Sequence, residues 1–332
     1  MLRSPYDRRI LALAVPALGA LAAEPLYVLV DTAIVGHLGT TQLAALAIAA
    51  TILTTAFTIF NFLTYGTTAH VARLHGAGRE EEAALVGSQA LWLSLFIGLV
   101  LLVAVVPLAP VAVSVMGGEG EVAEQAVLYL RIAALGAPFF MLSTAGQGYL
   151  RGIEDLRTPL VILIVAHAVN VVLELLFVYG FDWGLAGSAW GTVIAQAGMG
   201  AAFVAVQRRA GWQRPMWERI KPLMRIGSHI AVRTTALLGS FLVASAVLAR
   251  VSPAALGAHQ IAFQLFVFLA LVLDALAIAA QVMVGGMLGA GDAAGARAAT
   301  GRRRRSDRRR CGWRWRSAPC CSSPPSRSRP PP

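Results

Sequence analysis

Carboxylate side chains occur inside long apolar stretches of this sequence, where they favour ion-binding chemistry. Glu24, Asp31, Glu174 and Asp274 are each surrounded by aliphatic residues. A charged side chain within a bilayer is costly and usually faces a cavity or a partner. Two neighbouring carboxylates can share one proton or bind one cation, because both cannot ionise cheaply in a poorly solvated space. These residues are therefore candidates for a proton or cation site.

Helical spacing places several of these side chains on common faces. Glu24 and Asp31 are seven residues apart, which is two helical turns, so they share one face. Asn170 and Glu174 are one turn apart, and His167 lies one turn before Asn170. In a later apolar stretch, Thr192 adds a hydroxyl group.

A purely structural role is an alternative for each of these side chains. A buried polar group can bond freed backbone, end a helix or join two helices without binding an ion. The alternatives are a helix-end position for Asp31, a bond to backbone freed by Pro25 for Glu24, an interhelical hydrogen bond for Asn170 and Glu174, a core position for His167, a bond to its own helix for Thr192 and an ion pair with Arg233 for Asp274.

The composition indicates a membrane protein. The 332 residues are 57% hydrophobic and 14% charged, whereas soluble domains carry about 25% charged residues. A membrane helix needs about 20 mostly apolar residues, and a helix satisfies its backbone groups within one segment. We therefore predict an all-α polytopic bundle with spans near residues 10–35, 43–68, 84–107, 123–148, 158–181, 184–206, 223–249 and 256–288.

Basic residues in the connecting segments predict the orientation. Arg and Lys gather before the first predicted span and after the second, fourth and sixth, whereas the segments after the first, third and fifth contain none. Short basic segments stay on the cytoplasmic side. We therefore expect a cytoplasmic N-terminus in the cell inner (plasma) membrane. In this interpretation Arg151 lies in a connecting segment, and only Arg131 and Arg233 lie deep within spans.

Two parts of the chain repeat at a constant offset of 213 residues. Val35–Ala50 matches Leu248–Phe263 at four of 16 positions, and Val71–Ala83 matches Val284–Ala296 at five of 13. Both matches are ungapped and share one register, which is stronger evidence than either alone. Parallel repeats are typical of transporters. We predict a six-helix N-lobe at residues 1–213 and two helices of a second lobe at residues 214–300.

The C-terminal segment departs from this repeat. Residues 301–332 contain 11 arginines, one aspartate and all three cysteines, and they carry most of the net charge of +11. The repeat predicts another apolar span here, and the sequence has none. We interpret this basic, low-complexity tail as disordered and non-native. A phosphate- or lipid-binding arm is the alternative.

Motifs of enzymes are missing from the sequence. It contains no Walker A loop, HExxH, GxSxG or dinucleotide-binding fingerprint. We therefore expect no enzymatic activity, cofactor or metal site. Because residues 1–300 are nearly neutral, we also expect no nucleic-acid partner.

An ordered series of motifs resembles the multidrug and toxic compound extrusion (MATE) family, and its DinF-like branch most. The motifs are VDTAIVGHLG at 30–39, VARLHGAG at 71–78, LRG at 150–152, NVVLE at 170–174, GSAWGTVIA at 187–195, AHQIAFQ at 258–264 and LDALAIAAQVMVGGMLGAGD at 273–292. The resemblance covers residues 10–300. It implies a fold of twelve helices in two lobes, truncated here after the eighth helix.

The resemblance also implies a function and a site. Members of the family export organic, often cationic compounds in exchange for H⁺ or Na⁺. The family's cation site maps onto Asp31, Asn170, Glu174 and Thr192, and its bendable first helix maps onto Pro16. Glu174 stands where the branch often has aspartate. Secondary polar candidates are Glu24, His167 and Asp274, and we expect a monomer in membrane lipid with small organic substrates.

Other functions stay open at this point. A lipid-linked-glycan flippase of the same superfamily would be expected to show more cationic residues in its central cavity. A membrane-embedded enzyme would need His or Asp clusters at a membrane surface. An inactive, truncated product is the remaining alternative.

Overall fold

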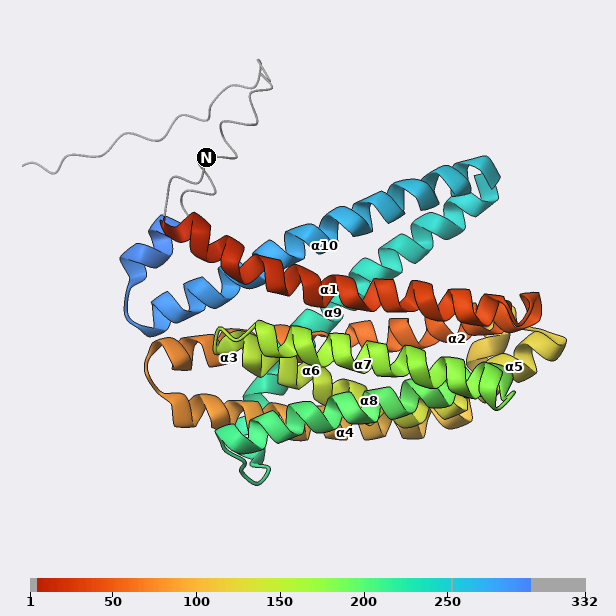
Figure 1. The fold of residues 1–332 in the computed structure, drawn as a ribbon. Coiled ribbons are helices and arrows are strands. Elements are labelled where there is room, and N and C mark those ends of the chain that lie inside the picture. Colours follow the sequence, from red (N-terminus) through yellow and green to blue (C-terminus); the bar gives the residue numbers. More distant parts are fainter. Residues whose placement is uncertain (1–4, 252, 300–332) are drawn as a thin grey trace, which may run out of the picture.

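The computed structural model describes residues 5–251 and 253–299, which form helices and no strand. Figure 1 shows them as a bundle of long, roughly antiparallel rods. In chain order the elements are α1 (Pro5–Gly36), α2 (Thr40–Ile59), α3 (Phe62–Gly76), α4 (Glu80–Val115), α5 (Gly120–Ala133), η1 (Ala134–Gly136), α6 (Ala137–Gly152), α7 (Arg157–Leu175), η2 (Leu176–Gly180), α8 (Gly184–Ala210), α9 (Trp217–Val251) and α10 (Pro253–Gly289). The predicted all-α fold is confirmed, and the predicted tail at 301–332 lies outside the described residues.

Seven segments of the described chain are long and apolar enough to cross a membrane. They are Arg8–Gly36, Thr40–Gly76, Glu80–Val115, Gly120–Gly152, Arg157–Gly180, Gly184–Ala210 and Leu265–Gly289. The predicted span at 223–249 differs, because α9 is a continuous helix but is not one of these segments. Its first half carries Arg225, His229 and Arg233, which lower its hydropathy.

Two of the spans are built from more than one helix. The second span is interrupted at Phe60 and Asn61, where α2 ends and α3 begins. In the fourth span, the short 3₁₀ turn η1 joins α5 to α6. Pro138 follows this turn and lacks the backbone N–H that a regular helix would use there.

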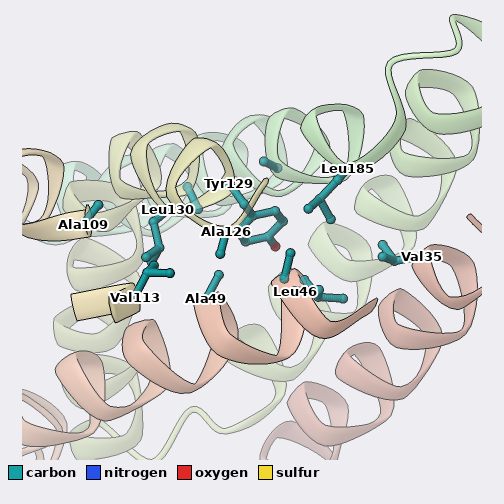
Figure 2. Close-up of a cluster of buried hydrophobic side chains, with 12 residues drawn as sticks. Val35, Leu46, Ala49, Ala109, Val113, Ala126, Tyr129, Leu130 and Leu185 are labelled. Atoms are coloured by element: carbon teal, nitrogen blue, oxygen red, sulfur yellow. The ribbon is translucent and has the colours of Figure 1, made fainter. Parts of the chain in front are cut away.

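Small side chains fill the interior, and larger apolar ones cover the outside. Figure 2 shows a buried cluster in which α1, α2, α4, α5 and α8 meet. Its labelled members are Val35, Leu46, Ala49, Ala109, Val113, Ala126, Tyr129, Leu130 and Leu185. On the outer face of α4, by contrast, Phe96 and Val103 are 61% and 72% exposed. Close packing through small residues with apolar side chains outside is the pattern of a bundle surrounded by lipid.

The helix bounds follow the repeat found in the sequence. The first residue of α10, Pro253, is the repeat equivalent of Thr40, where α2 starts. The last residue of α10, Gly289, is the repeat equivalent of Gly76, where α3 ends. Both copies are followed by a glycine with positive φ, Gly78 and Gly291. The backbone bond from the Arg79 N–H to the Leu74 carbonyl also recurs, from Asp292 to Met287, at 2.9 Å in both copies. These are the bonds and the left-handed glycine of one helix-ending motif.

The two copies also touch each other at these ends. A Cβ atom on Gly76 would collide with the Gly286 backbone, and one on Gly289 would collide with the Arg73 carbonyl. Gly286 is the repeat position of Arg73, and Gly289 that of Gly76. The contact is therefore self-complementary, as at a twofold axis, and it brings the backbones of α3 and α10 together.

Away from this crossing, the pair of helices α9 and α10 leaves the bundle. Figure 1 shows the end of α9 and the start of α10 projecting beyond the other helices at the upper right. The α10 helix packs mainly on α3, α1 and α9. A non-helical stretch at residues 211–216 precedes α9, close to the boundary predicted at residue 213.

Candidate functional site

A cavity of about 450 Å³ lies among the first eight helices. Its walls come from α1, α2, α3, α5, α6, α7 and α8. This volume is within the usual range for sites that bind drug-sized molecules. Every site residue predicted from the sequence on α1, α7 and α8 lies on or behind this cavity, except Pro16, which lies inside α1 away from the lining.

Asp31 is held at one end of the cavity by a hydroxyl from another helix. The residue is only 6% exposed. The Ser188 hydroxyl on α8 donates a hydrogen bond to Oδ1 of Asp31 at 2.9 Å. Ser188 is completely buried, so this bond ties α1 to α8 in the interior.

Glu174 lies behind Asp31 and is completely buried. Its carboxyl group lies beside the Asp31 carboxyl and the Ser188 hydroxyl. Neither Glu174 oxygen has a hydrogen-bond partner with acceptable geometry among the described residues. Immediately after it, α7 continues into the π-helical turn η2, and such turns are frequent at functional sites. A buried carboxyl group without a donor is costly, so a proton or cation would stabilise this pair.

Asn170 and Thr192 form a second polar group next to the carboxylates, together with Tyr27. The Asn170 amide donates to the Tyr27 hydroxyl at 2.9 Å and lies 3.3 Å from Oγ1 of Thr192. The hydroxyl groups of Tyr27 and Thr192 are 3.1 Å apart. Oδ1 of Asn170 is buried without a partner. The structure thus brings together the predicted residues Asp31, Asn170, Glu174 and Thr192.

Two of the secondary candidates, Glu24 and His167, also face the cavity. Both residues belong to its lining. The His167 ring stacks on the Tyr27 ring, with centroids 4.7 Å apart. Its Nε2 atom is buried without a hydrogen-bond partner, so His167 is not the satisfied core histidine that was the structural alternative.

Asp274 does not join this group. It lies on α10 and accepts a hydrogen bond of 2.8 Å from the Tyr65 hydroxyl on α3. Within the described side chains it forms no ion pair with Arg233, so that alternative was wrong. The tyrosine hydroxyl takes the place expected for the guanidinium.

Tyr27, Ser188 and Arg151 complete the polar groups described here and were not predicted from the sequence. Tyr27 is one turn before Asp31, and Ser188 is one turn before Thr192, so helical spacing was the available signal. Arg151 was assigned to a connecting segment, and that was wrong, because it lies in the last turn of α6 and is only 5% exposed. Side-chain exposure at a helix end depends on the neighbouring helices and leaves no local signal.

A helical bundle with several apolar spans around a polar cavity is the architecture of a multi-pass membrane protein. The MatE family model matches residues 16–176. This match covers just under half of the chain, and the relatives and structures below agree with it. Its relatives are transporters and not enzymes, as predicted.

Curated relatives match most of this chain. DETOXIFICATION 44, a chloroplastic protein of Arabidopsis thaliana, is 29% identical over 306 residues. DNA damage-inducible protein F of Escherichia coli is 29% identical over 296 residues. These matches cover 85% and 86% of this chain. The chain spans only 57% and 64% of the two relatives' own lengths.

Solved structures share the fold. A crystal structure of MATE in the bent conformation matches with a TM-score of 0.82 and 23% identity. That match covers 90% of this chain and 69% of the other. A MOP superfamily transporter from Pyrococcus furiosus matches with a TM-score of 0.80 and 22% identity over 90% of this chain and 68% of the other. These likenesses establish the MATE fold for the described helices.

Proposed function

We propose that this chain provides the ion-coupling lobe of a secondary multidrug exporter, which exchanges organic, often cationic compounds for H⁺ or Na⁺ by alternating access. The observation that carries the proposal is the pair Asp31 and Glu174, which has one hydroxyl donor among the described residues, Ser188. Two carboxylates with a single donor need a proton or a cation between them.

Electrostatics explains why the pair would hold one positive charge. Two like charges 4 Å apart repel by about 4 kcal/mol at an effective dielectric constant of 20. A proton shared by the two carboxyl groups removes this repulsion and satisfies the unpartnered oxygens of Glu174. A sodium ion could instead take oxygens from Asp31, Glu174 and Asn170. An organic cation near Asp31 would compete with either ion for the same negative charge.

This competition would be coupled to helix movement through α1. The polar bonds of Asp31 and Tyr27 join α1 to α7 and α8. Loading or release of the ion changes these bonds. Pro16 and Pro25 interrupt the hydrogen bonding inside α1, so this helix is easier to bend than an uninterrupted one. Bending of α1 would move the wall of the cavity and displace the substrate.

The setting of this activity follows from the sequence. Small organic molecules are the proposed substrates, and the coupling ion is the only other ligand that the mechanism requires. We place the chain in the plasma membrane as a monomer. Its N-terminus is placed in the cytoplasm because the basic connecting segments alternate with uncharged ones.

The experiment measures proton release when a cation binds. Tetraphenylphosphonium carries a permanent charge and no proton, so any proton that appears comes from the protein. The purified full chain in nanodiscs is titrated with it in weak buffer containing a pH-sensitive dye. We expect about one proton per bound cation, and no release from Asp31→Asn. The control is Asp182→Asn in an exposed turn with positive φ, where asparagine fits.

Sodium coupling gives a different result in the same assay. In that case no proton is released, and NaCl weakens tetraphenylphosphonium binding more than choline chloride does. Binding with neither proton release nor sodium competition contradicts the proposed exchange.

A further inference from the structure

Arg151 forms a charged site at the far end of the same cavity. It belongs to the cavity lining although the residue is only 5% exposed. One guanidinium nitrogen donates to Oε1 of Gln147 at 2.8 Å, one turn earlier on α6. This is its only hydrogen bond to a described residue. No Arg151 side-chain nitrogen is among the buried atoms that lack a hydrogen-bond partner. The guanidinium donors that do not bond Gln147 are therefore accessible from the cavity that Arg151 lines.

An acidic residue that acts on this site, Asp274, does not neutralise Arg151 directly. Asp274 influences Arg151 electrostatically, but the two do not form an ion pair within 4.0 Å among the described side chains. Its Oδ2 atom accepts the Tyr65 hydroxyl instead. Arg233 acts on the same tyrosine from α9. Of the described residues that line the cavity, Arg151 is the one that carries a charge at this end.

The other end of the cavity has the opposite sign. Glu24 and Asp31 line it, and Glu174 lies behind Asp31. The distance between the two ends can be estimated along α1. Ala17 on α1 packs in one cluster with Tyr65 and Ala275, and Ala275 follows Asp274 in the chain, so Ala17 marks the Arg151 end. Asp31 lies about four helical turns beyond Ala17 on α1. At 1.5 Å per residue the two ends are roughly 20 Å apart along the helix, and Glu24 lies about midway.

We infer that Arg151 binds an anionic group of the substrate, so that this cavity accepts zwitterionic organic compounds that carry a carboxylate at one end and a cationic group at the other. This inference rests on the proposed function and adds the substrate class. The carboxylate lies at Arg151, and the cationic group lies towards Glu24 and Asp31.

The donor geometry favours a carboxylate. A guanidinium group can bind both oxygens of a carboxylate through two parallel N–H donors, and Arg151 has donors to spare. Gln147 holds the guanidinium in place from the same helix face. The pairing would take place in a partly desolvated space, where charge–charge attraction is stronger than in water. A substrate with only a cationic group would leave Arg151 without this partner.

A matched pair of dyes tests the inference. Rhodamine 110 has a free carboxylate, and rhodamine 123 is its methyl ester, so the two differ in the anionic group alone. Fluorescence anisotropy gives the Kd of each dye for the full chain in nanodiscs. We expect Arg151→Gln to weaken rhodamine 110 binding at least tenfold and to change rhodamine 123 binding less than twofold. Arg151→Lys, which keeps the charge and loses the fork, should fall between.

The control is Arg131→Gln, which removes the same charge from an exposed arginine outside the cavity lining. It should leave both Kd values unchanged. Rhodamine 123 binding also reports that each variant is folded. Equal effects of Arg151→Gln on both dyes, or no effect on rhodamine 110, would overturn the role of Arg151. Failure of the unsubstituted chain to bind either dye would overturn the proposed substrate cavity together with this inference.

Discussion

The helices α1 and α9 occupy equivalent places in the sequence repeat, yet only α1 carries carboxylates of the proposed ion site. The equivalent residues differ at each polar or helix-bending site of α1. Pro16, Glu24, Pro25 and Asp31 correspond to His229, Leu237, Leu238 and Ala244. The repeat therefore reproduces the length and position of the helix without its carboxylates, and the proposed coupling is confined to one lobe.

In the next pair of equivalent segments, α2–α3 and α10, the way the helices end is preserved and the continuity of the helix differs. The span made of α2 and α3 is interrupted at Asn61, whereas α10 continues through the equivalent Asp274. Both end in the same turn, and they cross each other there. The repeat preserves the scaffold at this crossing and varies the chemistry elsewhere. Substitutions at the crossing and at the site should therefore have different effects.

Gly76→Ala should have the largest effect, because it adds a side chain where the two copies touch. The new Cβ would collide with backbone atoms of Gly286, which no side-chain rotation relieves. Overpacking of this kind costs about 1–3 kcal/mol. Thermal unfolding should show a lower Tm than for the unsubstituted chain. The matched control is Gly66→Ala in the same helix, where a Cβ meets nothing within 4 Å, and its Tm should be equal or higher. Equal Tm values for the two variants would contradict the close crossing.

Glu174→Gln should change the pH dependence of the proton release described above. Removing one of two neighbouring carboxylates removes the repulsion that opposes ionisation of the other. Asp31 should then give up its proton more easily, and the midpoint of release against pH should move down by about one unit or more. An unchanged midpoint would show that the two acids do not share a proton.

Ser188→Ala should move the same midpoint in the opposite direction by a smaller amount. The substitution removes the hydroxyl that donates to Asp31. Hydrogen bonds to charged groups contribute about 1.5–3 kcal/mol, which is roughly 1–2 pKa units, and loss of this donor disfavours the ionised carboxylate. The midpoint should rise by about one unit, at the low end of this range, as measured in the same titration. A fall in the midpoint would show that Ser188 does not stabilise the charged form.

Pro16→Ala should have the smallest effect on binding, and a selective effect on rate. The substitution restores a backbone donor inside α1 and makes the helix stiffer. Tetraphenylphosphonium affinity should change less than twofold, whereas stopped-flow proton release should slow severalfold. The control is the proline inside the other helix, Pro222→Ala near the start of α9, which should leave the rate unchanged. Equal rates in all three proteins would remove Pro16 from the mechanism.

Much of this architecture could be predicted from local sequence. Apolar length predicts the spans, and helical spacing predicts that Asn170 and Glu174 share a face. The partner of Asp31 could not be predicted in this way, because Ser188 meets it only through the contact and rotation of α1 against α8. Arg151 was misplaced for the same reason, since the packing of α6 against α3 and α10 decides its burial. Interactions within one helix leave a periodic pattern, whereas interactions between helices depend on their packing.

The crossing of α3 and α10 has a consequence for how force could pass between the two lobes. Atoms that meet there belong to the main chain, which has neither an ionisable group nor alternative rotamers. Its free energy of separation should therefore be insensitive to pH and salt, apart from the Arg9–Glu154 ion pair that lies beside Gly286. The contact can act as a fixed point about which the two helices rotate, and its strength stays constant while the carboxylates around Asp31 gain and lose charge. The change in charge would then take place at the carboxylates, whereas the contact about which the helices move would depend on steric packing alone.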